Sequence, residues 1–402
     1  MFDRTFVIVE LANILAGPIT AQYFAELGAR VIKVENPATR GDATRAWRTL
    51  NEDPHNDVSS YFSCTNWGKE SIALDFTKPE GLAVAHDLCR RADIVTASFK
   101  PGDAQKLGLD YTTLAKTNPK LIYGQINAYG EEDPRPGFDA IVQAEAGFTY
   151  LNGEPDGPPT KMPVALVDLL AAHQLKEALL LALLKRERTG DGSFVSVSLL
   201  QAAVSSLANQ ATNYLVGGVV PKRMGSEHPN IVPYGTILQG SDGRGVVLAA
   251  ATERQFRDFV KAIGRPELAD DPEYQTARQR VAKREELLGR IRAKTNTMTS
   301  AELAQALNES KVPYGFVNDM AAVFEQAGAQ ALLMQGERLG KPIRGVRSCA
   351  FTGDAGRRVL PLPPPHLHEH ARTILRDHLR YDEAKCDALA GAGVFGDLGT
   401  GT

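Results

Sequence analysis

Short apolar runs and longer amphipathic segments alternate through the first third of the chain, and this alternation is the feature that most constrains the fold. Strands are predicted over 6–11, 30–35, 71–76, 93–99 and 121–130, and helices between them over 17–28, 79–91 and 111–117. Strand–helix–strand units of this kind build a parallel sheet through right-handed crossovers. The sequence therefore predicts an α/β protein with a Rossmann-like sheet, whose ligands bind beyond the carboxyl ends of the strands. This rule places Asn13, Ser98, Phe99 and Asn127 near a candidate site.

A different texture interrupts this pattern in the middle of the chain. After a helix that begins near Asp168 and a strand over 194–198, the sequence predicts a hairpin and a group of amphipathic helices over 252–264, 276–297 and 300–311, followed by the strand VPYGFVN. We therefore predict three parts, which are a large domain over 1–221, a smaller α+β domain over 222–325, and a return to the large domain over 326–402.

The stretch 193–221 carries no charged residue, although it is rich in Ser, Asn and Gln. Those polar residues make it a poor candidate for a membrane-spanning helix. We predict a helix that is buried on most sides, either in an ordinary core or in a subunit interface.

The charge balance excludes some classes of partner. Lys and Arg number 45 against 48 Asp and Glu, so the net charge of −3 offers no positive surface field for nucleic acid or an anionic membrane. A phosphate-bearing ligand must then be held by a local cluster of basic residues. The four cysteines are widely spaced without a CxxC pair, which is typical of free thiols in a cytoplasmic protein.

Two short motifs suggest cofactors but do not support them. GAGVFG, over 391–396, has the letters of a dinucleotide-binding loop, yet it follows a helical pattern rather than a strand. HLHEH, over 366–370, has three alternating histidines but no further Cys or His cluster, so we predict a solvated helix start rather than a metal site. We expect no metal and no permanently bound cofactor.

A lone acid, Asp168, interrupts the apolar run MPVALVDLLAAHQL just before a long helix. An aspartate at a helix start accepts hydrogen bonds from the free N–H groups and suits the positive end of the dipole. The same carboxylate is also a candidate nucleophile. Three lysines, Lys69, Lys100 and Lys106, lie near strand ends, where each is typical of a solvated surface charge but together they could contact a phosphate. Spacing alone leaves these alternatives open.

Five segments in a single order resemble the class III CoA-transferases. They are VELANILAGPITAQYFAELGARVIKVENP, GDATR, NWGKESIALD, SFKPG and RTGDGSFVSVSLLQAA. The resemblance implies that Asp168 is the nucleophile, that CoA thioesters and small carboxylic acids are the substrates, and that two chains interlock as a homodimer. It also implies that the CoA contacts are Asn66, Lys69, Ser98, Phe99, Lys100, Lys106, Phe138 and Asp139.

The chain departs from the pattern at informative positions. Asn36 stands where many members have Arg, and Leu15 stands where formyl-CoA transferase has a glutamine, which implies a substrate other than formate or oxalate. The related α-methylacyl-CoA racemases carry a proton-exchanging histidine in a GHD triplet, whereas this chain has GFD over 137–139. We therefore predict a transferase, with a racemase-like enzyme and a non-catalytic CoA-binding protein as the alternatives.

A later region resembles the succinyl-CoA-using branch of the family, in the segments ATNYLVGGVVPKRMGSEHPNIVPYGTI and VPYGFVNDMAAVF. The resemblance implies a dicarboxylate substrate whose distal carboxylate is read by Arg223 or His228. It further implies aspartyl anhydride and aspartyl-CoA thioester intermediates at Asp168. We expect the N-terminus of the helix to help keep the Asp168 carboxylate ionised at neutral pH.

Overall fold

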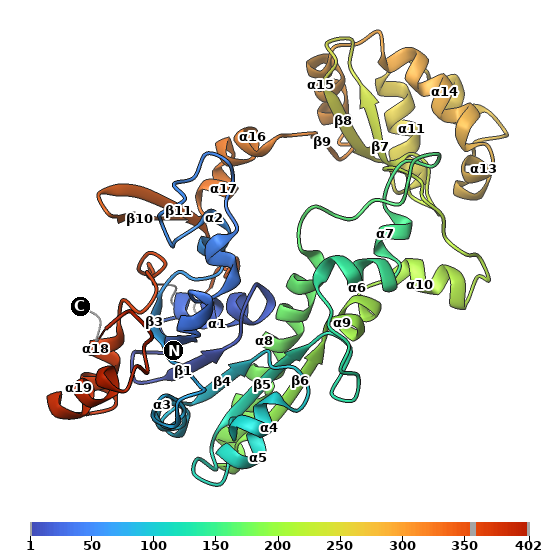
Figure 1. The fold of residues 1–402 in the computed structure, drawn as a ribbon. Helices are drawn as coiled ribbons and strands as arrows, with labels where there is room; N and C mark the ends of the chain where they lie inside the picture. Colours follow the sequence, from blue (N-terminus) through green and yellow to red (C-terminus); the bar gives the residue numbers. More distant parts are fainter. Residues whose placement is uncertain (1, 354–358, 400–402) are drawn as a thin grey trace. The chain divides into compact units, whose positions relative to one another are not determined.

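The computed structural model describes residues 2–353 and 359–399. Its centre is a six-stranded sheet in the order β3–β2–β1–β4–β5–β6, in which all neighbours are parallel (Figure 1). The strands are β1 (Val7–Leu11), β2 (Arg30–Glu35), β3 (Lys69–Ala73), β4 (Ile94–Ala97), β5 (Ile122–Asn127) and β6 (Ser193–Ser198). The predicted α/β fold with a parallel sheet is confirmed.

Helices cover both faces of this sheet, as a parallel sheet requires. On one side α1 (Ala16–Glu26) packs against α8 (Leu166–Thr189), which also contacts β5 and β6. On the other side α3 (Pro79–Arg90) contributes Val84 and Leu88 to a core that includes alternate residues of β1, β2 and β4. Strand order reverses between β1 and β4, so their carboxyl ends diverge into a crevice at this point.

The C-terminal part of the chain returns to this sheet and closes its β3 edge. The imidazole Nδ1 of His368 accepts the N–H of Ala73 at 3.0 Å, and that of His370 accepts the N–H of Ser71 at 3.4 Å. The His368 side chain is buried, so the prediction of a solvated helix start is wrong. The rings supply acceptors for strand N–H groups that have no neighbouring strand. Within residues 2–353 and 359–399, no cluster of three or more potential metal ligands is found.

Two compact units divide the chain. The first comprises Met1–Ala146, Pro163–Leu207 and Ala331–Thr402, and the second comprises Gly147–Met162 and Ala208–Gln330. The second unit therefore takes in 147–162 and 208–221, which the sequence analysis assigned to the large domain. Its antiparallel sheet is formed by β7 (Tyr234–Gln239), β8 (Gly245–Ala249) and β9 (Tyr314–Phe316).

Helices pack against the β7–β8–β9 sheet around a core of their own. They include α11 (Glu253–Ala262), α13 (Ala277–Ala282), α14 (Arg284–Thr295) and α15 (Ser300–Glu309). The predicted hairpin and amphipathic helices are confirmed, except that the single helix expected over 276–297 is divided into α13 and α14. The division falls at Lys283, which ends α13 and precedes α14.

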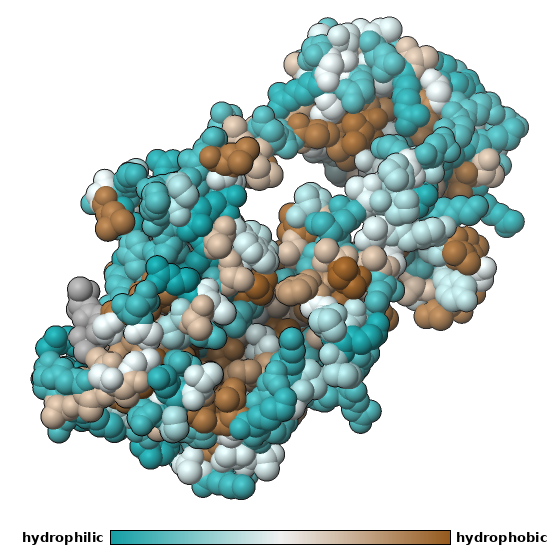
Figure 2. All heavy atoms as spheres, in the orientation of Figure 1, coloured by the Kyte–Doolittle hydropathy of each residue, from teal (hydrophilic) through white to brown (hydrophobic). Residues whose placement is uncertain are grey.

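The uncharged stretch 193–221 does not form one buried helix. Beyond β6 it forms α9 (Leu199–Ser205) and α10 (Ala208–Leu215), and α10 has no buried residue. Large apolar side chains of α10 and the segment after it are exposed, namely Tyr214, Leu215, Val216, Val219 and Val220. Figure 2 shows hydrophobic side chains at the surface in this part of the second unit. The prediction of burial in the core of this chain is therefore wrong for α10. Burial of α10 in a subunit interface stays a prediction.

No helix among the described residues has both the length and the apolar character needed to cross a membrane.

Candidate active site

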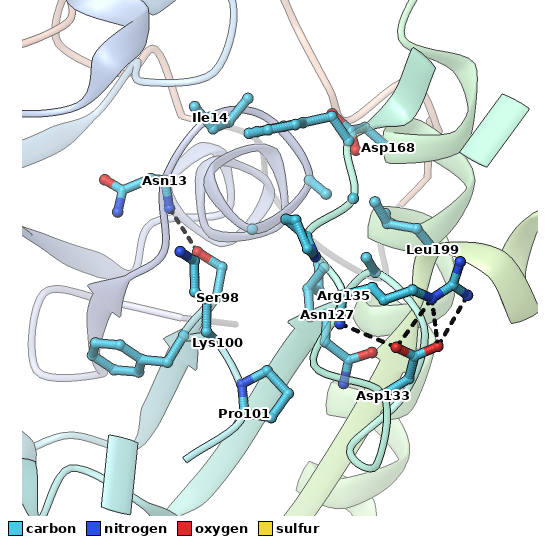
Figure 3. A pocket seen from close by; sticks show the side chains of 18 of the residues that line it. Asn13, Ile14, Ser98, Lys100, Pro101, Asn127, Asp133, Arg135, Asp168 and Leu199 are labelled. Atoms are coloured by element: carbon cyan, nitrogen blue, oxygen red, sulfur yellow. Dashed lines mark hydrogen bonds and ion pairs between the residues drawn. The ribbon is translucent and has the colours of Figure 1, made fainter. Parts of the chain in front are cut away.

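A cavity of about 300 Å³ lies beyond the carboxyl ends of β1, β4 and β5, at the point where the strand order reverses (Figure 3). Ser98, Lys100 and Asn127 reach it from the loops or ends of β4 and β5. Asp168, from the first turn of α8, lines the same cavity. The position agrees with the rule that ligands of such sheets bind at the strand-order switch.

Asp168 does not cap its helix. It lies in the first turn of α8, but the N-cap residue is Ala165, whose own side chain makes no capping hydrogen bond. The carboxylate that serves this helix start comes from Asp139, whose Oδ1 accepts the Val167 N–H at 2.8 Å. The second oxygen of Asp139 accepts a hydrogen bond from Gln143 Nε2 at 2.7 Å. The predicted capping role therefore belongs to Asp139, and the Asp168 carboxylate does not serve as the helix cap.

Burial changes the acidity of Asp168. Its side chain is only 7% exposed, and this burial, with a smaller contribution from the Asp139 charge, raises the pKa from 3.8 to about 7. A helix N-terminus typically contributes about 0.3–1 kcal/mol, which is roughly a fifth to three quarters of a pKa unit and too little to offset such burial. The expected help from the dipole therefore does not keep this carboxylate fully ionised at neutral pH. The carboxylate is instead poorly solvated and more basic than usual, which suits a nucleophile.

The first turn of α1 forms another wall of the cavity through Ala16 and Gly17. The amides of a helix's first turn have no acceptor within the helix, and the N-cap Leu15 has no side-chain bond. A Cβ on Gly17 would lie 2.3 Å from the Ala12 Cβ, so only glycine lets α1 approach the end of β1 this closely. The sequence thus places the first turn of α1, whose N–H groups have no acceptor within the helix, at the cavity that holds Asp168.

Asn66 and Lys69 are not brought to this cavity. The Lys69 ammonium is fully buried and donates to Glu10 Oε2 at 2.6 Å, the Pro18 carbonyl at 2.8 Å and Asn66 Oδ1 at 3.0 Å. These partners use all three of its donors. Burial lowers the pKa of Lys69 to about 8. In this arrangement Lys69 supports the first turn of α1 through the Pro18 carbonyl.

The predicted residues around the β4 turn divide into two groups. Ser98, Phe99 and Lys100 line the cavity, and the Lys100 side chain is exposed. Lys106 does not line the cavity. This exposed residue instead forms an ion pair with Asp103, three residues earlier, at 2.8 Å. Phe138 lines the cavity and is 59% exposed.

A second cavity of about 240 Å³ continues along the carboxyl edge of the sheet, beyond β1, β2 and β3. It shares Asn13 and Phe99 with the first cavity and is also lined by Asn36 and Phe76. The Asn36 side chain accepts the Ala38 N–H at 2.9 Å and so begins the short 3-10 turn Pro37–Thr39. In this chain Asn36 has a structural partner at the position where many members of the resembled family carry Arg.

Arg223 and His228 lie in the second unit, and both have partners there. Arg223 Nη1 donates to the Tyr150 carbonyl at 3.1 Å, and His228 Nδ1 accepts the Asn230 N–H at 3.1 Å. Burial, followed by the charge of Arg284, lowers the pKa of His228 below its ordinary value. The charged form of His228 is therefore disfavoured.

Comparison with known proteins decides the family of this chain. The family model described as CoA-transferase family III matches residues 5–371. The chain belongs to this family. It is 38% identical to a succinate–glutarate CoA-transferase of Agrobacterium fabrum, with 92% of this chain and 94% of the relative covered. It is 35% identical to a mouse succinyl-CoA:glutarate CoA-transferase, with 96% and 89% covered.

The fold agrees with this assignment. A crystal structure of a CAIB/BAIF family protein from Brucella suis is 37% identical to the chain and superimposes with a TM-score of 0.80, covering 94% of this chain and 98% of that one. The protein is thus a class III CoA-transferase, an enzyme whose substrates are CoA thioesters.

Several cavity residues of this CoA-transferase were not singled out by the sequence analysis. Ile14 comes from the loop after β1, and Asp133 and Arg135 come from the loop after β5, where the two side chains pair at 3.0 Å (Figure 3). The available signal was position, because each of these loops follows the carboxyl end of a predicted strand. Asn13 and Asn127 were placed near the site by that rule, and both line it.

Proposed function

We propose that this enzyme transfers CoA from succinyl-CoA to a short dicarboxylic acid, with Asp168 as the covalent nucleophile. The observation that carries the proposal is the buried Asp168 carboxylate in the cavity at the strand-order switch, raised to a pKa of about 7. The donor and the class of acceptor are supported by the relatives, whose names include succinate or succinyl-CoA and glutarate.

The reaction needs a carboxylate because each intermediate must stay activated. An Asp168 oxygen attacks the thioester carbon of succinyl-CoA, the C–S bond breaks, and a mixed anhydride and CoA thiolate form. The thiolate attacks the Asp168 carbonyl carbon, which releases succinate and leaves an aspartyl-CoA thioester. The acceptor carboxylate then displaces the thiolate to give a new anhydride. Attack of the thiolate on the acceptor's acyl carbon forms the product and regenerates the Asp168 carboxylate.

The first turn of α1 is suited to stabilise these steps. Each attack places negative charge on a carbonyl oxygen, and Ala16 and Gly17, whose N–H groups belong to the first turn of α1, line the cavity. A preorganised donor of this type typically contributes about 3–4 kcal/mol to a transition state. We propose these two amides as the oxyanion site. The buried Lys69 ammonium holds the same turn of α1 in place through its hydrogen bond to the Pro18 carbonyl.

The two cavities together provide a path for CoA. The second cavity has the aromatic side chains Phe76 and Phe99, which suit a nucleotide base, and it shares Phe99 with the cavity of Asp168. Lys100 is exposed beside the shared residues and can reach a phosphate. We propose that the nucleotide lies over the ends of β2 and β3 while the thioester reaches Asp168.

The acceptor's distal carboxylate needs a cation. Arg223 keeps a buried Nε without a hydrogen-bond partner among the described residues, whereas the lowered pKa of His228, the other predicted reader, disfavours its charged form. We propose Arg223 as the reader of the distal carboxylate. Arg223→Gln should then raise KM for a dicarboxylate acceptor by about 10- to 150-fold, since a charged hydrogen bond contributes about 1.5–3 kcal/mol, and leave a monocarboxylate of equal length unaffected.

We further propose an interlocked homodimer. The side chains that support it are 55–85% exposed and apolar, namely Tyr214, Leu215, Val216, Val219 and Val220. A second chain packed against them would remove them from water. Light scattering of the purified protein should give twice the chain mass of 43.5 kDa. A monomer at micromolar concentration would contradict the proposal.

Cys64, Cys89 and Cys386 form no disulfide bond among the described residues, and Cys89 and Cys386 are buried. Such thiols persist in a reducing compartment. We therefore propose a cytoplasmic location.

The covalent route is tested by intact-protein mass spectrometry. The protein is incubated with succinyl-CoA and quenched with hydroxylamine, which converts an aspartyl thioester or anhydride to the hydroxamate. We expect modification at Asp168 alone, and none in Asp168→Asn. Asp133→Asn is the matched control, because Asp133 is another acid of the same cavity.

Each alternative gives a distinct result in the same experiment. A hydroxamate that persists in Asp168→Asn would refute the nucleophile. Deuterium uptake at the α-carbon of a 2-methylacyl-CoA, without an adduct, would favour the racemase-like enzyme. Binding of CoA with neither reaction would favour a non-catalytic protein.

A further inference from the structure

Ile14 adopts a backbone conformation that its side chain disfavours. It follows β1 in the loop before α1 and has a φ of 73°. This left-handed region is sterically costly for a β-branched residue, whereas glycine adopts it freely. A strained residue persists only where the surrounding structure enforces it, and such residues gather at functional sites. An isoleucine here therefore requires a reason that depends on its side chain.

A buried ion pair enforces the conformation. The Asp42 carboxylate accepts the Ile14 N–H, with distances of 3.1 and 3.3 Å to its two oxygens. Lys33 Nζ lies 2.9 Å from Asp42 and also donates to the Ala12 carbonyl at 3.0 Å. The Lys33 and Asp42 side chains are completely buried. One ion pair thus fixes the backbone on both sides of Asn13.

The loop is fixed at a third point from the neighbouring strand. The Asn13 N–H donates to Ser98 Oγ at 3.1 Å. Polar groups of three successive residues, Ala12, Asn13 and Ile14, are therefore bound by side chains from β2, from the turn after it, and from the end of β4. This loop cannot relax to relieve Ile14 without breaking buried polar contacts.

The side chain held in this way lines the cavity of Asp168. Ile14 and Asp168 are seen along the same side of that cavity in Figure 3. Other apolar side chains, Leu15, Ile126 and Leu199, line it as well. An apolar wall gives a water molecule few of the two to four polar partners that it needs. The strained loop therefore places a hydrocarbon group in the cavity that holds the Asp168 carboxylate.

We infer that Ile14 is a positioning residue that keeps water from the acylated Asp168, so that CoA passes to a carboxylic acid and not to water. The inference rests on the proposed function. In the reaction that Ile14 suppresses, the oxygen of water adds to the Asp168 carbonyl carbon of the thioester and the C–S bond breaks. The thiolate takes a proton from the added water, which leaves free CoA and the Asp168 carboxylate. Each such event wastes one donor thioester.

The test measures how the full-length enzyme divides succinyl-CoA between hydrolysis and transfer to glutarate. Ile14→Gly removes the side chain at a position where glycine is unstrained, so the variant should fold, and Ile14→Val keeps a β-branched group there. Leu339→Gly is the control for strain alone, because Leu339 has a φ of 50° and is 77% exposed. Free CoA and glutaryl-CoA are quantified by chromatography.

We expect the ratio of hydrolysis to transfer to rise about tenfold or more in Ile14→Gly, the effect of a barrier difference near 1.4 kcal/mol. Ile14→Val and Leu339→Gly should stay within about twofold of the unaltered enzyme. An unchanged ratio in Ile14→Gly would overturn the inference, and so would an equal rise in Leu339→Gly. If the unaltered enzyme itself formed no glutaryl-CoA and no Asp168 adduct, the proposed function would fail instead.

Discussion

Replacing Asp168 by asparagine should stabilise the folded protein while abolishing transfer. Folding raises the pKa of this carboxyl from 3.8 to about 7. Each pKa unit corresponds to 1.36 kcal/mol, so the ionised side chain costs the folded state about 4 kcal/mol. Asparagine has nearly the same shape and no charge to bury. Natural enzymes commonly carry such a cost at the group that performs the chemistry.

The sign and the pH range follow from the direction of this pKa change. Below pH 3.8 the carboxyl is neutral in both states and costs nothing. The cost grows as the pH rises from 3.8 to about 7, because the unfolded chain ionises first, and it is complete above pH 7. The stability gained in Asp168→Asn should therefore be about 4 kcal/mol at pH 8 and only about 1 kcal/mol at pH 4.5.

Urea unfolding, monitored by circular dichroism, measures the stability gain at each of the two pH values. All samples have the same protein concentration, because the stability of a self-associating protein depends on its concentration. Asp133→Asn is the control, since Asp133 lines the same cavity with a third of its side chain exposed. A gain that is equal at the two pH values, or absent at pH 8, would refute the assignment of a desolvated charge to Asp168.

Three further changes test other parts of the site. Lys69→Met leaves Glu10 short of a buried partner, so urea unfolding should show a loss of about 3–5 kcal/mol, and no loss would contradict the buried network. Asp139→Asn removes the charge that helps to raise the Asp168 pKa, so the acid limb of kcat/KM should move to lower pH; movement to higher pH would oppose this. Gly17→Ala places a methyl group 2.3 Å from the Ala12 Cβ, so thermal unfolding should reveal a loss of about 1–3 kcal/mol, and an unchanged Tm would refute the close approach.

The elements of the sheet could be predicted from the sequence because each has a strong local pattern. β2 has the predicted bounds, and β1 and α3 agree to within a residue or so. β3 begins two residues before the predicted strand, at Lys69, because a fully buried lysine is unusual and the pattern treats it as a surface residue. Its burial depends on Glu10, which is distant from it in sequence, and on Asn66, which is near but polar.

The site was predictable in part for the same reason. The rule for strand ends placed Ser98, Phe99 and Asn127 correctly. It could not show that Asp139, 28 residues before Val167, supplies the hydrogen bond to the start of α8. Without that contact Asp168 resembles an ordinary helix-start residue, and its altered acidity depends on burial that no local pattern reports.

The two imidazoles on the edge of β3 have a consequence for how the protein is made. His368 and His370 bond to strand residues that are 295 and 299 positions earlier in the chain. At roughly 5–20 residues per second, synthesis completes that separation in about 15–60 s. Throughout that interval the nascent sheet has an open edge able to pair with another strand. Residues 368 and 370 thus cover the β3 edge only late in synthesis, and until then the edge is open to pairing with strands of other chains.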